Sequence, residues 1–202
     1  MTICVICKKE IKHYTFFYNL SNKLSICTKC FSSFPVVHKK IKFHEVEVYS
    51  IYAYRQPINA LLMDLKMKGD IALSMVFLSP FKNYIEFMFK DYIILPVPST
   101  KASDKKRGFN HVVEISKALN LEVKEVFYKS KDYKQTNQKF GNRKDISKVI
   151  KLKVNLDKKK KYLLLDDVMT SGNTIKTCID LLRKQDIKNI KVLVVSDNYH
   201  KW

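Results

Sequence analysis

The chain has 202 residues, 46% of them hydrophobic, which suits one globular domain with a small additional module and excludes a wholly disordered chain. Its 38 basic residues outnumber 19 acidic ones, so the net charge of +19 favours a polyanionic partner. The longest apolar run, residues 71–81, is interrupted and falls short of the roughly 20 residues that span a bilayer. No signal peptide is indicated, because cysteines interrupt the N-terminus, and we expect a cytoplasmic protein without a transmembrane segment.

Four cysteines near the start of the chain form two Cys-x-x-Cys pairs, and these are Cys4, Cys7, Cys27 and Cys30. A two-residue spacer lets both thiolates of a tight turn reach one ion, and two such turns complete a tetrahedral zinc site. Disulfide bonds are the alternative, which a reducing compartment disfavours. We therefore expect a structural zinc knuckle over residues 1–40 and a larger domain over residues 41–202.

The larger domain alternates between strand and helix patterns. We expect strands over residues 44–54, 92–97, 123–128, 162–165 and 191–195, with a further apolar segment at 149–154. We expect helices from Pro57, within residues 71–89, around residues 112–119 and over residues 174–184. Such alternation predicts an α/β fold whose mainly parallel sheet is covered by helices on both faces.

An acidic pair and a small-residue loop follow the apolar residues 162–165. Asp166 and Asp167 would emerge at the carboxyl edge of the sheet, where parallel sheets bind their ligands. The next residues let the backbone fold around an anion at the start of a helix, and they are Val168, Met169, Thr170, Ser171, Gly172, Asn173 and Thr174. The carboxylates can accept hydrogen bonds from ribose hydroxyls while the adjacent loop holds a 5'-phosphate. The motif therefore predicts a sugar-phosphate site.

Three other kinds of motif share some of these residue types. A Walker B strand also ends in acidic residues, but no G-x-x-x-x-G-K-[ST] loop occurs in the chain. A receiver domain carries its acidic pair near its first strand, whereas only one predicted strand follows this pair. The remaining alternative, an ordinary polar turn, does not require so dense a set of acidic, hydroxyl and glycine residues.

The segment 129–161 concentrates the positive charge, with thirteen basic residues against three acidic ones. Aromatic residues lie among the lysines, an arrangement that suits stacking on bases beside phosphate contacts with single-stranded DNA. Compositional bias and a solvated loop are the alternatives. The candidate DNA-binding residues are Lys105, Lys106, Lys131, Tyr133, Lys134, Lys139, Phe140, Arg143 and Lys144.

The motifs resemble the type I phosphoribosyltransferases and, more specifically, the ComF family of competence proteins. The resemblance runs from about residue 4 to residue 196. It rests on the four cysteines, residues 54–70 with Lys66 and Gly69, Leu95-Pro96-Val97-Pro98, Arg107-Gly108-Phe109-Asn110, Gln138, Arg143 and residues 164–174. The chain departs from the family at His111, where Gln is frequent, and at Asn173, where Gly or Ala is usual.

This resemblance implies roles for particular residues. Asp166 and Asp167 would meet the ribose hydroxyls of phosphoribosyl pyrophosphate, and residues 170–174 would hold its 5'-phosphate. The loop with Ser99, Thr100 and Lys101 would take the pyrophosphate, Arg107 would close over it, and Mg²⁺ would accompany the ligand.

The family's role implies a competence protein that handles incoming single-stranded DNA beside a helicase and a recombination mediator, with peripheral association at the inner face of the membrane. Two alternatives remain open. One is a metabolic phosphoribosyltransferase that transfers phosphoribose to a nucleobase, although no base-recognition hood is evident. The other is a zinc-dependent adaptor that recruits a helicase.

Overall fold

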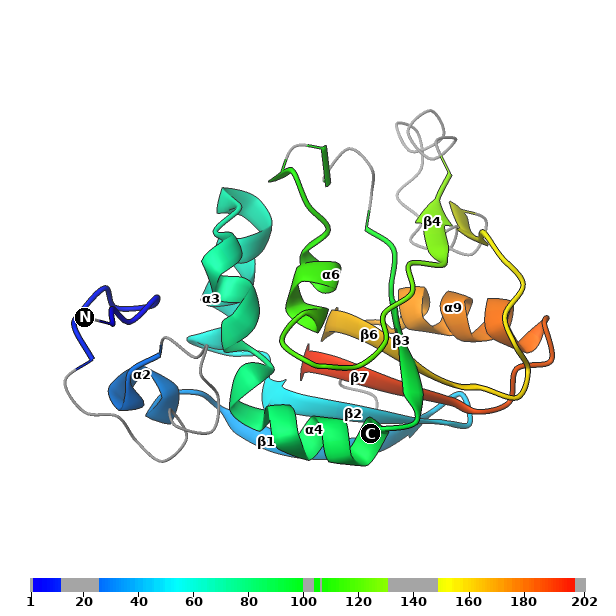
Figure 1. Ribbon diagram of the computed structural model, residues 1–202, viewed down its shortest axis with the longest axis horizontal. Helices are drawn as coiled ribbons and strands as arrows, with labels where there is room; N and C mark the ends of the chain where they lie inside the picture. Colours follow the sequence, from blue (N-terminus) through cyan, green and yellow to red (C-terminus); the bar gives the residue numbers. More distant parts are fainter. Residues whose placement is uncertain (1, 12–25, 100–103, 106, 131–148, 199–202) are drawn as a thin grey trace.

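The computed structural model describes residues 2–11, 26–99, 104–105, 107–130 and 149–198 (Figure 1). Its centre is a five-stranded sheet in the order β1-β2-β7-β6-β3. The strands are β1 (Val36–Phe43), β2 (Val46–Ala53), β3 (Tyr92–Pro96), β6 (Lys161–Met169) and β7 (Ile190–Asp197). Only β1 and β2 pair antiparallel, and the pairs β2–β7, β7–β6 and β6–β3 are parallel. The predicted mainly parallel sheet is thus confirmed.

The helical segments were largely anticipated by the apolar spacing of the sequence. They are α2 (Thr28–Ser32), α3 (Ile58–Met63), η1 (Asp64–Lys68), η2 (Ile71–Val76), η3 (Ser79–Phe81), α4 (Lys82–Phe89), α6 (His111–Ser116) and α9 (Asn173–Arg183). Pro80 lies in η3 and separates the two predicted halves of residues 71–89. None of the helices that the structure describes is long and apolar enough to cross a membrane.

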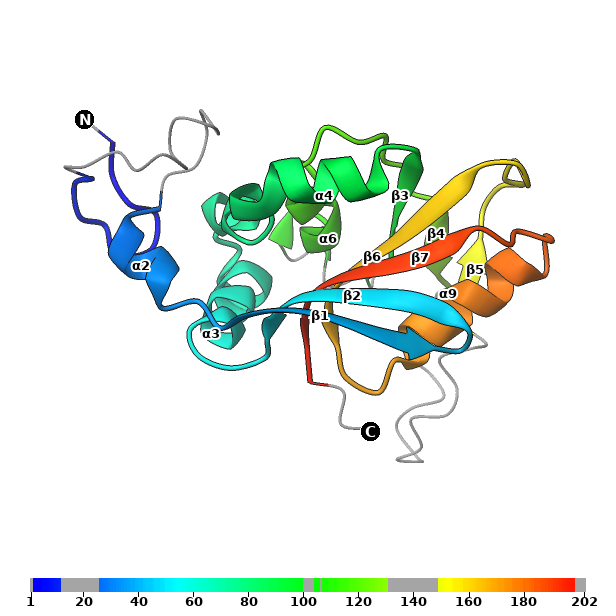
Figure 2. The ribbon, with the colours of Figure 1, turned by 90° about the horizontal axis from the view of Figure 1, so that it is seen from below.

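Helices cover both faces of the sheet. The segments between β2 and β3 and the helix α6 lie on one face, and α9 lies on the other (Figure 2). Right-handed crossovers account for the opposite placement of α9 and of the segments between β2 and β3, because the connection from β2 to β3 and the connection from β6 to β7 run in opposite directions across the sheet. Buried apolar residues of β6, β7 and α9 form much of the core between the layers.

Strand β6 is longer than the sequence indicated. The prediction ended it at Leu165, but ladder pairing continues from Asp166 opposite Val194 to Met169 opposite Asp197. The acidic pair therefore lies within the strand, not beyond its end. Pairing with β7 satisfies the backbone here, so polar side chains do not terminate the strand.

The strand β1 was not predicted, and residues 44–54 proved to be mostly β2. Three lysines in β1 obscure the strand pattern, and charged residues are typical of the edge of a sheet. The prediction at 123–128 was also displaced: β4 (Phe127–Lys129) pairs with β5 (Ile150–Leu152) in a separate small sheet, while Val123 makes one bridge to Ile94.

The N-terminal residues pack against the larger domain through aromatic rings. Phe31 in α2 lies edge-on to Phe34, which in turn lies edge-on to the buried Tyr52 of β2 at a centroid distance of 5.5 Å. Phe31 also meets Phe81 at 6.1 Å. Strand β1 continues through residue 40, where the two expected units divide.

Candidate functional site

A cleft of about 300 Å³ opens at the carboxyl ends of the parallel strands. This is the edge where α/β sheets place their ligands. The cleft is lined by residues from both faces of the sheet and from the loop after β3, and these are Lys66, Val97, Pro98, Ser99, Arg107, His111, Val112, Lys129, Asp166, Asp167, Val168 and Thr174.

The two carboxylates reach this cleft because β3 is shorter than β6. Pro96 pairs with Leu165, the last register position of β3, whereas β6 continues to Met169. Adjacent residues in a strand point to opposite faces, so Asp166 and Asp167 lie on different sides of the sheet. Beyond the end of β3 the cleft is lined by both of them.

Asp167 is buried and surrounded by cationic or ionisable groups. It forms an ion pair with Lys66, and its Oδ2 lies 3.7 Å from Nε2 of His111. Burial opposes ionisation, but Lys66 and His111 outweigh it and hold the pKa of the Asp167 carboxyl well below its usual value. Asp167 is therefore a charged carboxylate at neutral pH.

Asp166 behaves in the opposite way. Desolvation and the neighbouring charge of Asp167 raise the pKa of the Asp166 carboxyl well above its usual value. Its Oδ1 accepts the backbone N–H of Asp167 at 2.8 Å. The pair thus combines one ionised carboxylate with one that takes up a proton readily, as neighbouring carboxyl groups do.

A second, smaller pocket adjoins the cleft and is formed by the loop between β6 and α9. It is lined by Asp166, Val168, Met169, Thr170, Ser171, Gly172, Asn173, Thr174 and Ile175. The loop leads into the first turn of α9, whose N–H groups and dipole attract an anion. Asp166 lines both pockets, so it lies between the anion loop and the main cleft.

Gly172 gives this loop its shape. Its backbone is left-handed, with φ of 72°, and a β-carbon there would lie 2.5 Å from Cζ of Phe43. Only glycine accepts both the conformation and the close contact. Phe43, at the end of β1, therefore packs directly beneath the loop.

The loop after β3 is tied to Arg107. Nη2 of Arg107 donates to Oδ1 of Asp104 at 2.9 Å, and the hydroxyl of Ser99 also bonds to Asp104. Nη1 of Arg107 donates to the backbone carbonyl of Lys66 at 3.2 Å. Arg107 thus connects the end of β3 to the segment that carries Lys66.

The structure brings together most of the residues assigned from the sequence to the sugar-phosphate ligand. Ser99, Arg107 and residues 166–174 all line one of the two pockets. Thr100 and Lys101 lie outside the described residues. So do most of the candidate DNA contacts, namely Lys106, Lys131, Tyr133, Lys134, Lys139, Phe140, Arg143 and Lys144, while Lys105 is described and exposed.

Sequence reasoning did not assign Lys66, His111 or Lys129 to the site, although all three line the cleft. A signal existed for the first two. Lys66 follows Leu62 by four residues, and His111 precedes Ile115 by four, so each polar residue continues a buried apolar face of its helix. Lys129 gave no comparable signal, because it belongs to a lysine-rich segment.

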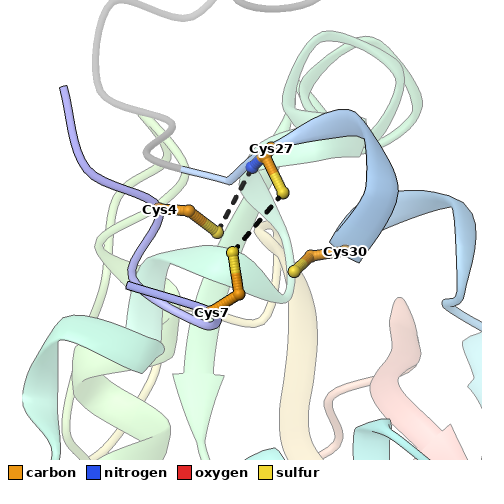
Figure 3. A group of neighbouring side chains, drawn as sticks. All are labelled: Cys4, Cys7, Cys27 and Cys30. Carbon is orange, nitrogen blue, oxygen red and sulfur yellow. Dashed lines mark hydrogen bonds between the residues drawn. The ribbon is translucent and has the colours of Figure 1, made fainter. Parts of the chain in front are cut away.

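The four N-terminal cysteines converge as predicted (Figure 3). Their sulfur atoms all lie within 4.8 Å of one another, and the sulfurs of Cys7 and Cys27 are 3.8 Å apart. Zinc–sulfur bonds of about 2.3 Å in a tetrahedron place sulfurs about 3.8 Å apart, so the cluster fits such an ion. All five cysteines are free thiols, which excludes the disulfide arrangement in this structure.

The backbone around Cys4 favours the thiolate form of this residue, whereas burial and the neighbouring thiols raise the pKa of Cys30. Burial opposes ionisation of Cys4, but N–H groups of Cys7, Cys27 and Ile6 outweigh it and lower its pKa to about 7. The N–H of Cys27 lies 3.4 Å from the Cys4 sulfur. Metal ligation requires this deprotonated form.

Comparison with known proteins shows what the chain is similar to. Residues 105–202 match the phosphoribosyl transferase domain family. The competence protein ComFC of Streptococcus pneumoniae is 26% identical over 142 residues, covering 70% of this chain and 64% of the relative. ComFC of Bacillus subtilis is 24% identical over 128 residues, covering 62% and 53%. The chain thus spans rather more than half the length of these relatives.

Two solved structures are also similar. A hypoxanthine phosphoribosyltransferase from Staphylococcus aureus has a TM-score of 0.43 at 11% identity, covering 61% of this chain and 62% of its own. A purine phosphoribosyltransferase from Pyrococcus horikoshii has a TM-score of 0.36 at 16% identity, covering 64% and 82%.

The matching family model, the parallel sheet and the cleft at its carboxyl edge define a phosphoribosyltransferase-like domain, here preceded by a cysteine cluster that could hold a metal ion. Within that class the chain is similar to ComFC, which confirms the resemblance to the ComF family that its motifs indicated.

We expect the purified protein to contain about one zinc ion per chain, measured by plasma mass spectrometry. Cys27→Ser should lose the ion, because three thiolates bind zinc more weakly than four. Cys178→Ala is the control, since Cys178 is a buried residue of α9, outside the cluster, and its removal should leave the zinc content unchanged. Equal zinc in wild type and Cys27→Ser would contradict the site.

Gly172→Ala should destabilise the protein more than Gly69→Ala. Both glycines have φ near 73°, so each alanine incurs about 1 kcal/mol of left-handed strain. A β-carbon at Gly69 has open space around it, whereas one at Gly172 collides with Phe43. We expect at least about 1 kcal/mol more loss in the free energy of unfolding for Gly172→Ala, measured by urea denaturation. Equal losses would contradict the close packing.

Proposed function

We propose that this protein acts in natural transformation, where it handles incoming single-stranded DNA in the cytoplasm and binds phosphoribosyl pyrophosphate in the cleft. The observation that carries the ligand assignment is the placement of Asp166 between the anion loop and the main cleft. The similarity to ComFC supports the role in competence.

The order of groups along the two pockets matches the order of groups in this ligand. The loop over residues 170–174 and the start of α9 offer backbone N–H groups to a 5'-phosphate. Asp166 and Asp167 accept hydrogen bonds from the ribose hydroxyls. The cleft wall formed by Val97 to Ser99 and Arg107 then receives the pyrophosphate.

Magnesium would accompany the ligand. Mg²⁺ prefers oxygen donors and is usually bound by one or two carboxylates together with substrate phosphates, a donor set that the cleft and the ligand together provide. Asp166 is the available carboxylate, because Asp167 already has Lys66 as its counter-ion. The ion would neutralise charge on the pyrophosphate.

The role in DNA handling rests on charge. The segment 129–161 has a net charge of +10 and includes Tyr133 and Phe140 among its lysines. Lysine and arginine side chains displace counter-ions from the phosphates of single-stranded DNA, and aromatic rings stack on its bases. Together they provide affinity that does not depend on the DNA sequence.

Calorimetry with phosphoribosyl pyrophosphate and Mg²⁺ tests the ligand. Wild type should bind, and Asp166→Ala/Asp167→Ala should bind at least about 100-fold more weakly, since both carboxyl groups that would meet the ribose hydroxyls are lost. Asp91→Ala, immediately before β3 and at the opposite end of that strand from the carboxyl edge, should bind as wild type does. Absence of a binding signal with wild type would refute ligand binding. In a separate activity assay, release of pyrophosphate in the presence of a nucleobase would indicate a transferase.

Binding of a short single-stranded oligonucleotide, measured at several salt concentrations, tests the proposed handling of DNA. Replacing Lys139, Arg143 and Lys144 by Gln should lower the slope of log K against log salt by about 2, at roughly 0.7 per lost phosphate contact. The same change at Lys90, Lys184 and Lys188, which are exposed and lie outside the segment 129–161, removes equal charge and should alter the slope less. Absence of wild-type binding at about 100 mM salt would refute DNA handling.

A further inference from the structure

Lys66 occupies an unusual position in the cleft. It lies in η1, and its ammonium forms an ion pair with the buried carboxylate of Asp167. The Lys66 side chain remains 28% exposed, whereas that of Asp167 is 6% exposed. The lysine therefore covers the carboxylate on the cleft side and borders the space that a ligand would enter.

The backbone of Lys66 is held by Arg107, and its ammonium is held by the ion pair with Asp167. Arg107 bonds to the Lys66 carbonyl, and Arg107 is itself fixed by Asp104, which also bonds to Ser99. Lys66 is thus anchored to the wall that would take the pyrophosphate. A lysine side chain carries a compact charge on a flexible stem, so its ammonium can exchange partners while the backbone stays in place.

The pairing conflicts with the proposed use of Asp167. A carboxylate that is committed to Lys66 is a poorer acceptor for ribose hydroxyls, and removing its cation would leave a buried charge uncompensated. A pyrophosphate on the wall from Val97 to Ser99 offers Lys66 a stronger anionic partner within the same cleft. Asp167 then keeps His111 beside it, with Oδ2 3.7 Å from Nε2, and its freed lone pairs face the ligand.

We propose that Lys66 is a specificity-determining residue that moves from Asp167 to the pyrophosphate of the ligand, so that the site selects a sugar carrying a pyrophosphate over ribose 5-phosphate. This inference rests on the proposed binding of phosphoribosyl pyrophosphate. A sugar with only a 5-phosphate fills the anion loop but gives Lys66 no new partner, so Asp167 stays paired.

The first experiment measures a ratio of affinities. Calorimetry with Mg²⁺ compares phosphoribosyl pyrophosphate with ribose 5-phosphate on wild type, Lys66→Met and Lys68→Met. Lys68 is the matched control, because it lies two residues away in the same segment, is 73% exposed and pairs with Asp64. The preference for the pyrophosphorylated sugar should fall about 10-fold or more in Lys66→Met and stay unchanged in Lys68→Met.

A second experiment does not depend on the folding of Lys66→Met. Asp167→Asn and Asp166→Asn each remove one carboxylate from the cleft, but only the first releases Lys66. Binding of inorganic pyrophosphate should therefore tighten more in Asp167→Asn than in Asp166→Asn, by about 5-fold or more. Equal tightening would show that Lys66 does not reach the anion and would overturn the inference.

The outcomes separate the two proposals. If wild type binds phosphoribosyl pyrophosphate but Lys66→Met keeps the full preference, the exchange is refuted while the proposed ligand stands. If wild type binds neither sugar phosphate, the proposed ligand is refuted and the inference with it. Loss of preference in Lys66→Met alone, with Lys68→Met unchanged, supports both.

Discussion

The site depends on the unequal lengths of β3 and β6. If both strands ended together, Asp166 and Asp167 would face opposite layers with a ladder between them. Because β3 stops at Pro96 while β7 continues to support β6 as far as Met169, the acidic strand projects past its neighbour. One cleft can then include groups from α6 and η1 on one face and the anion loop on the other. The opposed pKa shifts of the two carboxyls follow from these different surroundings.

Much of this fold could be predicted because β6, β7 and α9 are locally consistent. Their apolar residues have the spacing typical of the strand or helix that they form. The acidic pair followed by small residues also predicts an anion-binding loop from the local sequence alone. The spacing of the cysteines was also sufficient to predict their cluster, because two cysteines separated by two residues can both point toward one ion. These features depend on residues close together in the sequence.

The remaining features depend on pairing between distant residues. The end of β6 was misplaced because hydrogen bonds from β7 override the low strand propensity of aspartate. The edge strand β1 was missed because its lysines conceal it. Lys66 and Asp167 are about a hundred positions apart, and only the packing of η1 against the sheet edge reveals that they meet.

Strand β1 runs between the cysteine-bearing segment and the loop before α9. Just before it, Phe34 meets Phe31 of the cysteine-bearing segment and Tyr52 edge-on, and at its end Phe43 packs beneath Gly172. Strand β1 therefore follows directly on the aromatic contacts of the cysteine-bearing segment and ends beneath the loop before α9, so one strand separates the cysteine cluster from the candidate anion loop.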